Sequence, residues 1–297
     1  MTPQAQAIVS AHQALALTVP HSSATNPGVV PEGGEVYAHA KAACLALGFI
    51  DIDAECVARA WQAMVNRTGD FNPTHWPDQA VDFGMRPWPR TDAFLPCPKR
   101  LGLYAVLPDA AWVGRMARAG VPTVQLRFKS DDAQAVKQEV QAAVAAVQGT
   151  SALLFINDHW QAAIEACAYG VHLGQEDMDS AAIDVIRAAG LRLGLSSHGY
   201  AEMMRADALS PSYIAMGAVF PTTLKRMVTP PQGTARLHAY AKLMRDYPLV
   251  AIGGIDAYKF PQVLSSGVSS VAVVRAITGA ENPEAAAAEL QHCLSSF

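Results

Sequence analysis

Short apolar runs alternate with longer amphipathic segments over the second two thirds of the chain. The apolar runs are rich in Val, Ile and Leu and have lengths typical of buried strands. Eight of them can be counted, at residues 101–107, 123–129, 152–158, 170–174, 192–198, 213–220, 249–255 and 271–277. Between them, Ala-rich segments of helical period predict helices, for example at residues 131–147, 201–208, 236–246 and 283–294.

The alternation of strands and helices predicts an α/β fold. Strands that are apolar on both faces indicate a parallel sheet covered on both sides, and eight such units close most naturally into a (β/α)8 TIM barrel. A doubly wound open sheet is the alternative. It is less well supported because no G-x-G-x-x-G sequence follows the first strand.

The first 99 residues have a different pattern, which predicts a mainly helical, Pro-rich extension. Helices are expected at residues 35–47 and 53–65, the second with Asp53 as its N-cap. We therefore expect two parts, an extension over residues 1–99 and a barrel over residues 100–297.

The end of this extension combines proline with large aromatic residues. Between residues 66 and 100, six prolines are interleaved with Trp76, Trp88 and Phe94. Proline fixes φ and aromatic side chains favour burial, so this pattern is typical of an ordered strap. Residues 19–34, rich in Ser, Pro and Gly, look like a loop. We expect the extension to pack on the barrel helices and stabilise them.

Composition and charge exclude several classes of protein. The 297 residues carry a net charge of −4, which excludes a basic nucleic-acid binder. Hydrophobic residues make up 51% and charged residues only 16%, so the chain must bury much surface and global disorder is excluded. No apolar run reaches the ~18 residues of a membrane helix, so no membrane partner is expected.

Cysteine use and the N-terminus indicate a reducing compartment. The five cysteines are widely spaced and form no C-x-x-C pair or Cys/His cluster of ligand spacing, so neither a disulfide framework nor a zinc site is expected. The first twenty residues lack the cationic segment and cleavage pattern of a secretory signal. A cytoplasmic location is therefore expected.

Polar residues gather where the predicted strands end, the face that carries active sites in this fold. Alternation along the second run points Gln125, Arg127 and Lys129 to one side, and two cations there suggest an anionic ligand such as phosphate. The alternative is a solvated strand end at which these cations pair with local carboxylates.

Carboxylates follow the next two strands. Asn157 and Asp158 end the third run and Asp177 follows the fourth, so hard oxygen ligands lie beside the cationic strand and favour a Mg²⁺–phosphate complex. The alternative is that Asp158 and Asp177 are helix N-caps. At the end of the fifth run, Ser196 offers a hydroxyl and His198 is a possible acid or base, although a lone histidine there is more often structural.

A second anion site is predicted from the last three strands. Thr222 and Lys225 follow the sixth run and can hold an anion together with backbone N–H groups. Gly254 and Arg275 belong to strands seven and eight, where this fold often binds phosphate, although the glycine pair could form only a tight turn. His172, inside the fourth run, is interpreted as a hydrogen-bonded core residue. Two anion sites and Mg²⁺ suggest two phosphorylated substrates or one bisphosphorylated substrate.

Six motifs in register carry a resemblance to a known family. QLRFK, FINDHWQAAIEACAYGVHLGQED, GLSSH, YIAMGAVFPTTLK, VAIGGI and VAVVRAI together resemble the thiamine-phosphate synthases, from residue 101 to the C-terminus. The resemblance implies a TIM-barrel transferase that joins hydroxymethylpyrimidine diphosphate to thiazole phosphate. It implies Mg²⁺-assisted, dissociative loss of pyrophosphate.

The resemblance also implies residue roles. The pyrimidine diphosphate would be held by Gln125, Arg127, Lys129, Asn157, Ser196 and Lys225, of which Arg127, Lys129, Ser196 and Lys225 are the candidate catalytic residues. Asp158 and Asp177 would bind Mg²⁺. The thiazole phosphate would be held by Thr222, Gly254, Val274 and Arg275.

Three positions depart from the family pattern. Phe128 replaces an acidic residue and is expected to point outward, where it matters little. Leu224 replaces a threonine and Arg275 replaces a serine, and we hypothesise that the arginine compensates for the lost hydroxyl. A thiazole tautomerase shares the fold, but the synthase is favoured by Asn157, Asp158, Asp177 and Lys225. A non-catalytic, ligand-sensing barrel is the third reading. Small phosphorylated molecules are the expected partners, and a homodimer is possible.

Overall fold

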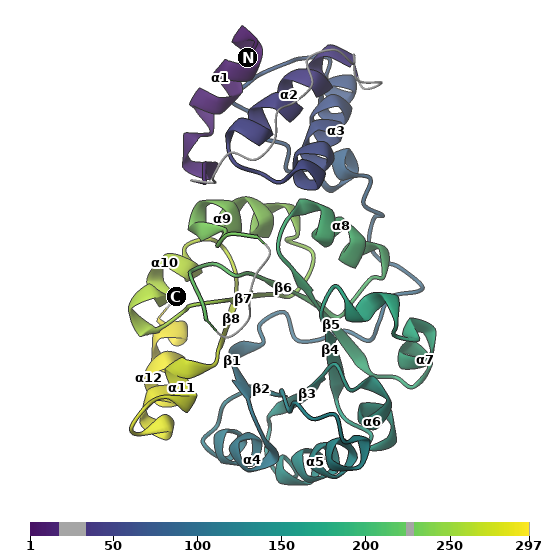
Figure 1. The fold of residues 1–297 in the computed structure, drawn as a ribbon, viewed down its shortest axis with the longest axis vertical. Helices are drawn as coiled ribbons and strands as arrows, with labels where there is room; N and C mark the ends of the chain where they lie inside the picture. The colour runs from purple at the N-terminus through teal and green to yellow at the C-terminus, as the bar shows by residue number, and fades with distance from the viewer. Residues whose placement is uncertain (18–33, 224–228, 297) are drawn as a thin grey trace.

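Eight parallel strands form a closed barrel in chain order, which confirms the expected fold (Figure 1). The computed structural model describes residues 1–17, 34–223 and 229–296. Each strand pairs with the next, and the eighth pairs with the first. The strands are β1 (Gly102–Leu107), β2 (Thr123–Leu126), β3 (Leu153–Asn157), β4 (Gly170–Leu173), β5 (Arg192–Ser197), β6 (Tyr213–Met216), β7 (Leu249–Ile252) and β8 (Ser270–Val273).

Helices cover the outside of the barrel between the strands. Several begin at a side chain that accepts N–H bonds from the first turn, as Asp109 does from Trp112 and Asn282 from Ala285. The barrel helices are α4 (Ala110–Arg118), α5 (Ala133–Ala146), α6 (Trp160–Glu165), α7 (Ile183–Ala188), α8 (Tyr200–Ala208), α9 (Gly233–Leu243), α10 (Phe260–Leu264), α11 (Arg275–Thr278) and α12 (Pro283–Ser295).

The sixth apolar run is longer than the strand that it forms. β6 ends at Met216, whereas the sequence predicts a strand to residue 220. Beyond β6 the backbone still bonds to the end of β7, since the N–H of Val219 donates to Ile252 O and that of Phe220 to Gly253 O, each at 3.0 Å. After β6 a loop thus replaces the regular strand, and this loop stays hydrogen-bonded to the end of β7.

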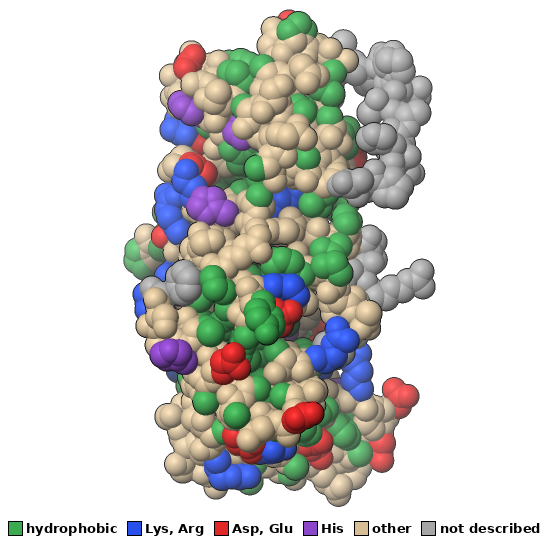
Figure 2. Space-filling model, turned by 90° about the vertical axis from the view of Figure 1, so that its left-hand side faces the viewer, with side chains coloured by type: hydrophobic (Ala, Val, Ile, Leu, Met, Phe, Trp, Pro, Cys, Tyr) green, Lys and Arg blue, Asp and Glu red, His purple; other side chains and the backbone are tan. Residues whose placement is uncertain are grey.

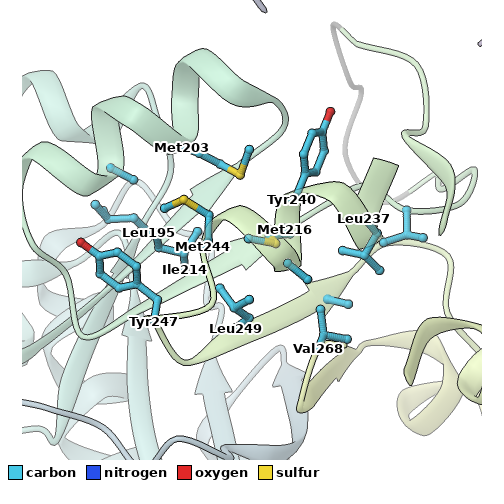
Figure 3. Close-up of a cluster of buried hydrophobic side chains, with 14 of the residues drawn as sticks. Leu195, Met203, Ile214, Met216, Leu237, Tyr240, Met244, Tyr247, Leu249 and Val268 are labelled. Atoms are coloured by element: carbon cyan, nitrogen blue, oxygen red, sulfur yellow. The ribbon is translucent and has the colours of Figure 1, made fainter. Parts of the chain in front are cut away.

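Side-chain alternation divides the strands between two cores. The inner core includes Tyr104, Phe155 and Tyr213, whose rings meet inside the barrel. The outer core lies between the strands and the helices. In the part drawn in Figure 3, Met203 of α8 and Met244, the C-cap of α9, face strand residues that include Leu195, Ile214, Met216 and Leu249. The barrel interior is therefore a packed layer rather than a pore.

The N-terminal helices stack on one side of the barrel, beyond α8 and α9 (Figure 1). They are α1 (Pro3–Ala11), α2 (Gly34–Ala46) and α3 (Asp51–Thr68), with the short 3₁₀ helices η1 (Gln13–Leu15) and η2 (Ala80–Phe83). α3 packs on α8, and η1 packs on α9. The predicted loop at residues 19–34 lies almost wholly outside the described residues.

Asp53 caps a different helix from the one expected. α3 begins at Asp51, with Ile50 as an N-cap that makes no side-chain bond. The buried carboxylate of Asp53 instead accepts the N–H of Ala201 at 2.9 Å, in the first turn of α8. Gly199, the N-cap of α8, has no side chain for this role, and a Cβ there would lie 2.1 Å from Asp53 Oδ2. The prediction was wrong because capping rules consider only local sequence.

Removing this contact should destabilise the protein. Replacing Asp53 by Ala leaves N–H groups of α8 without an acceptor, so we expect a loss of about 1 kcal/mol in the free energy of unfolding. Asp53→Asn keeps one acceptor oxygen and should lose less. Urea denaturation of both variants checks this, and equal stabilities for Asp53→Ala and the wild type would contradict it.

A buried arginine joins α9 to the N-terminal helices. Arg236 is 2% exposed, and it donates to Leu15 O and Leu47 O, each at 2.9 Å, and to Gln232 Oε1 at 3.0 Å. Its guanidinium also lies 3.6 Å from the ring centroid of Phe49. Burial lowers the pKa of this guanidinium, so these partners offset a real desolvation cost. The extension therefore supplies two of the hydrogen-bond acceptors of this buried guanidinium, and the barrel supplies Gln232.

The proline-rich strap is ordered and tied to the barrel by a second buried cation. Arg90 pairs with Asp207 at 2.8 Å, and the side chains are 2% and 6% exposed. Phe94 is buried as expected, whereas Trp88 is 39% exposed. Trp88 instead places its ring over the Arg90 guanidinium, 4.8 Å from the centroid. The expectation of a buried strap is thus met by Phe94 but only partly by Trp88.

The described helices include no candidate for a membrane span. Within residues 1–17, 34–223 and 229–296, every helix is too short or too polar to cross a bilayer. Basic and acidic side chains are interspersed on the face shown in Figure 2.

Candidate active site

A cavity of about 970 Å³ opens at the carboxyl ends of the strands. It brings together residues from the strands and from the loops that follow them, as the fold predicts. The expected site residues that line it are Gln125, Arg127, Lys129, Asn157, Asp158, Asp177, Ser196, Thr222, Gly254, Val274 and Arg275. Lys225 and Leu224 lie outside the described residues.

The cationic side of the cavity follows β2. The N–H of Arg127 donates to Leu107 O at 2.8 Å, so the β1–β2 ladder continues just past the strand and fixes the backbone of Arg127. Arg127 is half-buried and Lys129 is exposed. Among the described residues neither side chain lies within ion-pair distance of a carboxylate, which argues against simple local pairing. Both charges are available to an anionic ligand.

Asp158 and Asp177 lie together on the adjacent side. Burial, followed by the charge and hydrogen bonding of Asp177, raises the pKa of Asp158 to about 6. Asp158 has a positive φ of 63°, an uncommon conformation for a residue other than glycine, and its N–H donates to His172 O at 3.0 Å. The backbone therefore holds one carboxylate against another of the same charge.

The capping alternative is not supported for Asp158. α6 begins at Trp160 with His159 as its N-cap, and no side chain caps it. The carboxylate of Asp177 accepts the N–H of Gly174 at 3.1 Å, within its own loop. Neither residue therefore supplies the N-cap of a following α-helix.

The carboxylate pair fits a hard divalent cation that shares its ligands with a substrate. In the described part of the chain no three His, Cys, Asp or Glu side chains are grouped as a complete metal site. Mg²⁺ commonly takes only one or two protein carboxylates and completes its shell with phosphate oxygens and water. Burial and the nearby charge of Asp177 together raise the pKa of Asp158, and a bound cation would stabilise both carboxylates in their charged form.

The other side of the cavity is built from backbone. Gly253 and Gly254 both have positive φ, 108° and 64°. A Cβ on Gly254 would lie 2.5 Å from Pro221 O, so glycine is needed for the two loops to approach. The pair is therefore more than a surface turn, because it forms part of the cavity wall together with Thr222 and Arg275.

Two further polar residues, Lys259 and His198, line the cavity. Lys259, which the sequence analysis missed, donates to Gly254 O and to Asp256 Oδ2, each at 2.7 Å. In the sequence, its position five residues after Gly254 is the signal that could have placed it at this wall. His198 bonds through Nδ1 to Glu202 Oε2 at 2.6 Å, which ties it to the first turn of α8. This contact supports the structural interpretation of His198.

Comparisons with known proteins agree with this geometry. The family model for thiamine monophosphate synthase matches residues 103–277. A thiamine-phosphate synthase of Neisseria meningitidis is 58% identical over 192 residues, which cover 65% of this chain and 94% of the relative. One from Cronobacter sakazakii is 53% identical over 190 residues, covering 64% and 90%.

A solved structure supports the same relationship. Thiamine phosphate pyrophosphorylase from Pyrococcus furiosus is 28% identical, with a TM-score of 0.57 over 66% of this chain and 96% of that chain. The matched region in each comparison is the size of the barrel, not of the whole chain. Since the family model matches residues 103–277, more than half of its length, the chain belongs to the thiamine monophosphate synthase family.

Proposed function

We propose that this chain joins hydroxymethylpyrimidine diphosphate to thiazole phosphate and releases pyrophosphate, as a thiamine-phosphate synthase. The observation that carries this proposal is the single cavity that unites a cationic wall, a carboxylate pair and a glycine-lined wall. We assign this activity to residues 100–297 and a packing role to residues 1–99. The names of the relatives support the assignment.

The pyrimidine diphosphate would bind on the β2 to β5 side. Gln125 is 5% exposed and lies within β2, whereas Arg127 and Lys129 follow the strand, so Gln125 suits the pyrimidine ring rather than the diphosphate. Arg127 and Lys129 would contact diphosphate oxygens, and Asn157 and Ser196 would add neutral hydrogen bonds. Lys225 is proposed for the same diphosphate from its sequence position alone.

The main chemical difficulty is the charge that develops on the leaving diphosphate. Asp158 and Asp177 would hold Mg²⁺, which when bound supplies positive charge to the departing oxygens. The C–O bond breaks with its electron pair going to the diphosphate, and the thiazole nitrogen captures the pyrimidine methylene cation. Arg127 and Lys129 stabilise the separated charge through preorganised donors, a type of contribution often worth ~3–4 kcal/mol per donor.

The thiazole phosphate would bind on the β6 to β8 side. Thr222, Gly254 and the backbone at Val274 line that wall, and Arg275 begins α11 at its edge. Arg275 is exposed and can offer a charge-assisted bond to the phosphate. Leu224 is outside the described residues, so the proposal that Arg275 compensates for the hydroxyl missing at position 224 rests on Arg275 alone.

Replacing Arg275 by Ser should therefore weaken binding of one substrate. We expect the KM for thiazole phosphate to rise about five- to tenfold, because one partly solvated charge-assisted bond is lost, while the KM for the pyrimidine substrate stays constant. Steady-state kinetics with each substrate varied in turn checks this. Arg115→Ser, which breaks an ion pair with Glu284 on the outer helices, is the matched control. An unchanged KM for thiazole phosphate would eliminate this role.

Release of pyrophosphate tests the proposed function directly. The purified chain is incubated with both substrates and Mg²⁺, and pyrophosphate and thiamine phosphate are quantified. We expect both products in equal amounts and neither when Mg²⁺ is chelated. A thiazole tautomerase or a non-catalytic barrel would release no pyrophosphate, so that result would overturn the proposal.

Finer features of the protein stay predictions. Small phosphorylated substrates are the partners that the family relationship supports. A homodimer is a prediction that light scattering of the purified chain checks. A cytoplasmic location is likewise a prediction, and fractionation of the cells that produce the protein checks it.

A further inference from the structure

A chain of four hydrogen bonds runs beneath the cavity and connects Gln125 to Ser196. Gln125 Nε2 donates to the Tyr104 hydroxyl at 2.9 Å, and the Tyr104 and Tyr213 hydroxyls lie 2.7 Å apart. Tyr213 contacts His172 Nδ1 at 2.7 Å, and His172 Nε2 contacts Ser196 Oγ at 2.8 Å. The chain thus crosses the barrel from β2 through β1, β6 and β4 to β5.

The strand register places a glycine, Gly194, between two members of this hydrogen-bond chain. His172, Gly194 and Tyr213 are direct neighbours across β4, β5 and β6. A Cβ at Gly194 would lie 2.1 Å from Tyr213 Cζ, so the phenol occupies the space above the glycine and reaches across β5 to the imidazole. The two rings stack with centroids 5.6 Å apart. The contact between Tyr213 and His172 therefore depends on the packing of the inner core and on the glycine at position 194.

The number of available protons determines in which direction the hydrogen bonds of this series are donated. Tyr104 is 2% exposed, and within the described residues its hydroxyl has Gln125 and Tyr213 as its partners. The amide nitrogen can only donate, so the single proton of Tyr104 must go to Tyr213. The proton of Tyr213, which is fully buried, then goes to His172 Nδ1. The reverse direction would leave a buried phenolic proton without an acceptor, unless the Gln125 carboxamide were turned over.

The same count determines the state of the imidazole. A charged ring would donate from Nδ1, which would turn the Tyr213 proton towards Tyr104 and leave the Tyr104 proton without an acceptor. His172 is therefore neutral with its proton on Nε2, and it donates to Ser196 Oγ. Because the serine oxygen accepts this bond, its own proton is free to point into the cavity, which Ser196 lines.

We propose that Tyr104, Tyr213 and His172 are positioning residues that hold the Ser196 hydroxyl as a hydrogen-bond donor to the substrate diphosphate. This inference rests on the proposed function and deepens it. A serine that donated to His172 would present lone pairs to an anion, whereas this one presents a proton. Such preorganisation matters most as negative charge grows on the leaving group.

A double-mutant cycle tests whether Tyr213 acts through Ser196. Tyr213→Phe removes the bond to His172 Nδ1 and should lower kcat by about tenfold with a smaller change in KM, less than the ~10²–10³ lost with a whole preorganised donor. In a Ser196→Ala background the same substitution should change kcat less than about twofold, since coupled residues are non-additive. Equal losses in the two backgrounds would overturn the proposal, because they would show a merely structural effect.

A matched control separates folding from positioning. Tyr240 on α9 is also buried, and its hydroxyl donates to Gln232 Oε1 at 3.0 Å outside the cavity. Tyr240→Phe should cost a similar amount of stability and leave kcat unchanged.

The imidazole tautomer provides a test on the wild-type protein that needs no substrate and uses a variant only to assign the signal. In ¹⁵N-histidine-labelled wild type, the His172 signal, assigned by its loss in His172→Gln, should show a protonated Nε2 and an unprotonated Nδ1. A proton on Nδ1 would overturn the proposal, since it reverses the chain. A wild type that releases no pyrophosphate would count against the proposed function, while the tautomer would still decide the direction of the chain.

Discussion

Replacing Asp177 by Ala is expected to lower kcat/KM by about 100-fold or more while the barrel stays folded. With Asp158, this side chain supplies the protein oxygens of the proposed Mg²⁺ site, and losing one of two leaves the diphosphate charge poorly balanced. Within the described residues its side chain supports the local fold by accepting the N–H of Gly174, a bond worth about 1 kcal/mol. The effect should therefore be catalytic rather than structural.

Kinetics at several Mg²⁺ concentrations measures this effect. Asp177→Ala should need far more Mg²⁺ for half-maximal rate, with a melting temperature close to that of the wild type. Asp179→Ala is the matched control, because Asp179 lies two residues further on and pairs with Arg205 away from the cavity. Full turnover with unchanged Mg²⁺ dependence in Asp177→Ala would remove the metal assignment.

Deleting residues 1–95 is expected to lower the melting temperature by about 10 °C or more. The deletion removes Arg90 and leaves Asp207 buried without its cation, a kind of loss that costs ~3–5 kcal/mol. It also removes Leu15 O and Leu47 O, the acceptors of the buried Arg236. At ~2–4 °C per kcal/mol for a chain of this size, the ion pair alone accounts for most of the shift.

Calorimetry of the truncated and full-length proteins checks this expectation. Arg90→Met in the full chain isolates the strap contact, and it should give part of the loss but not all of it. A truncated protein as stable as the full chain would show that the extension does not stabilise the barrel.

The barrel could be predicted because its signals are local. Apolar runs and helical periodicity each depend on a few neighbouring residues, and the structure has a strand in each of the eight predicted runs. The polar residues of the cavity were also predictable, since parallel strands bring their carboxyl ends to one face. Their roles in binding and catalysis stay predictions.

The features that were missed depend on pairs far apart in sequence. Asp53 caps a helix that begins almost 150 residues later, since its bond to Ala201 spans 148 positions. Tyr104 and Tyr213 looked like ordinary strand residues, and only the register across Gly194 shows that their hydroxyls meet. No propensity or periodicity carries such information, because these contacts exist only after the barrel has closed.

The contact between Asp53 and the start of α8 also bears on how such a chain can be redesigned. While the extension is present, position 199 has no room for any atom beyond the backbone. In a barrel without the extension that space would be open, and a serine or aspartate at position 199 could cap α8 with its own side chain. The same substitution would thus harm the natural chain and repair the trimmed one, so the two parts constrain each other's choice of amino acids.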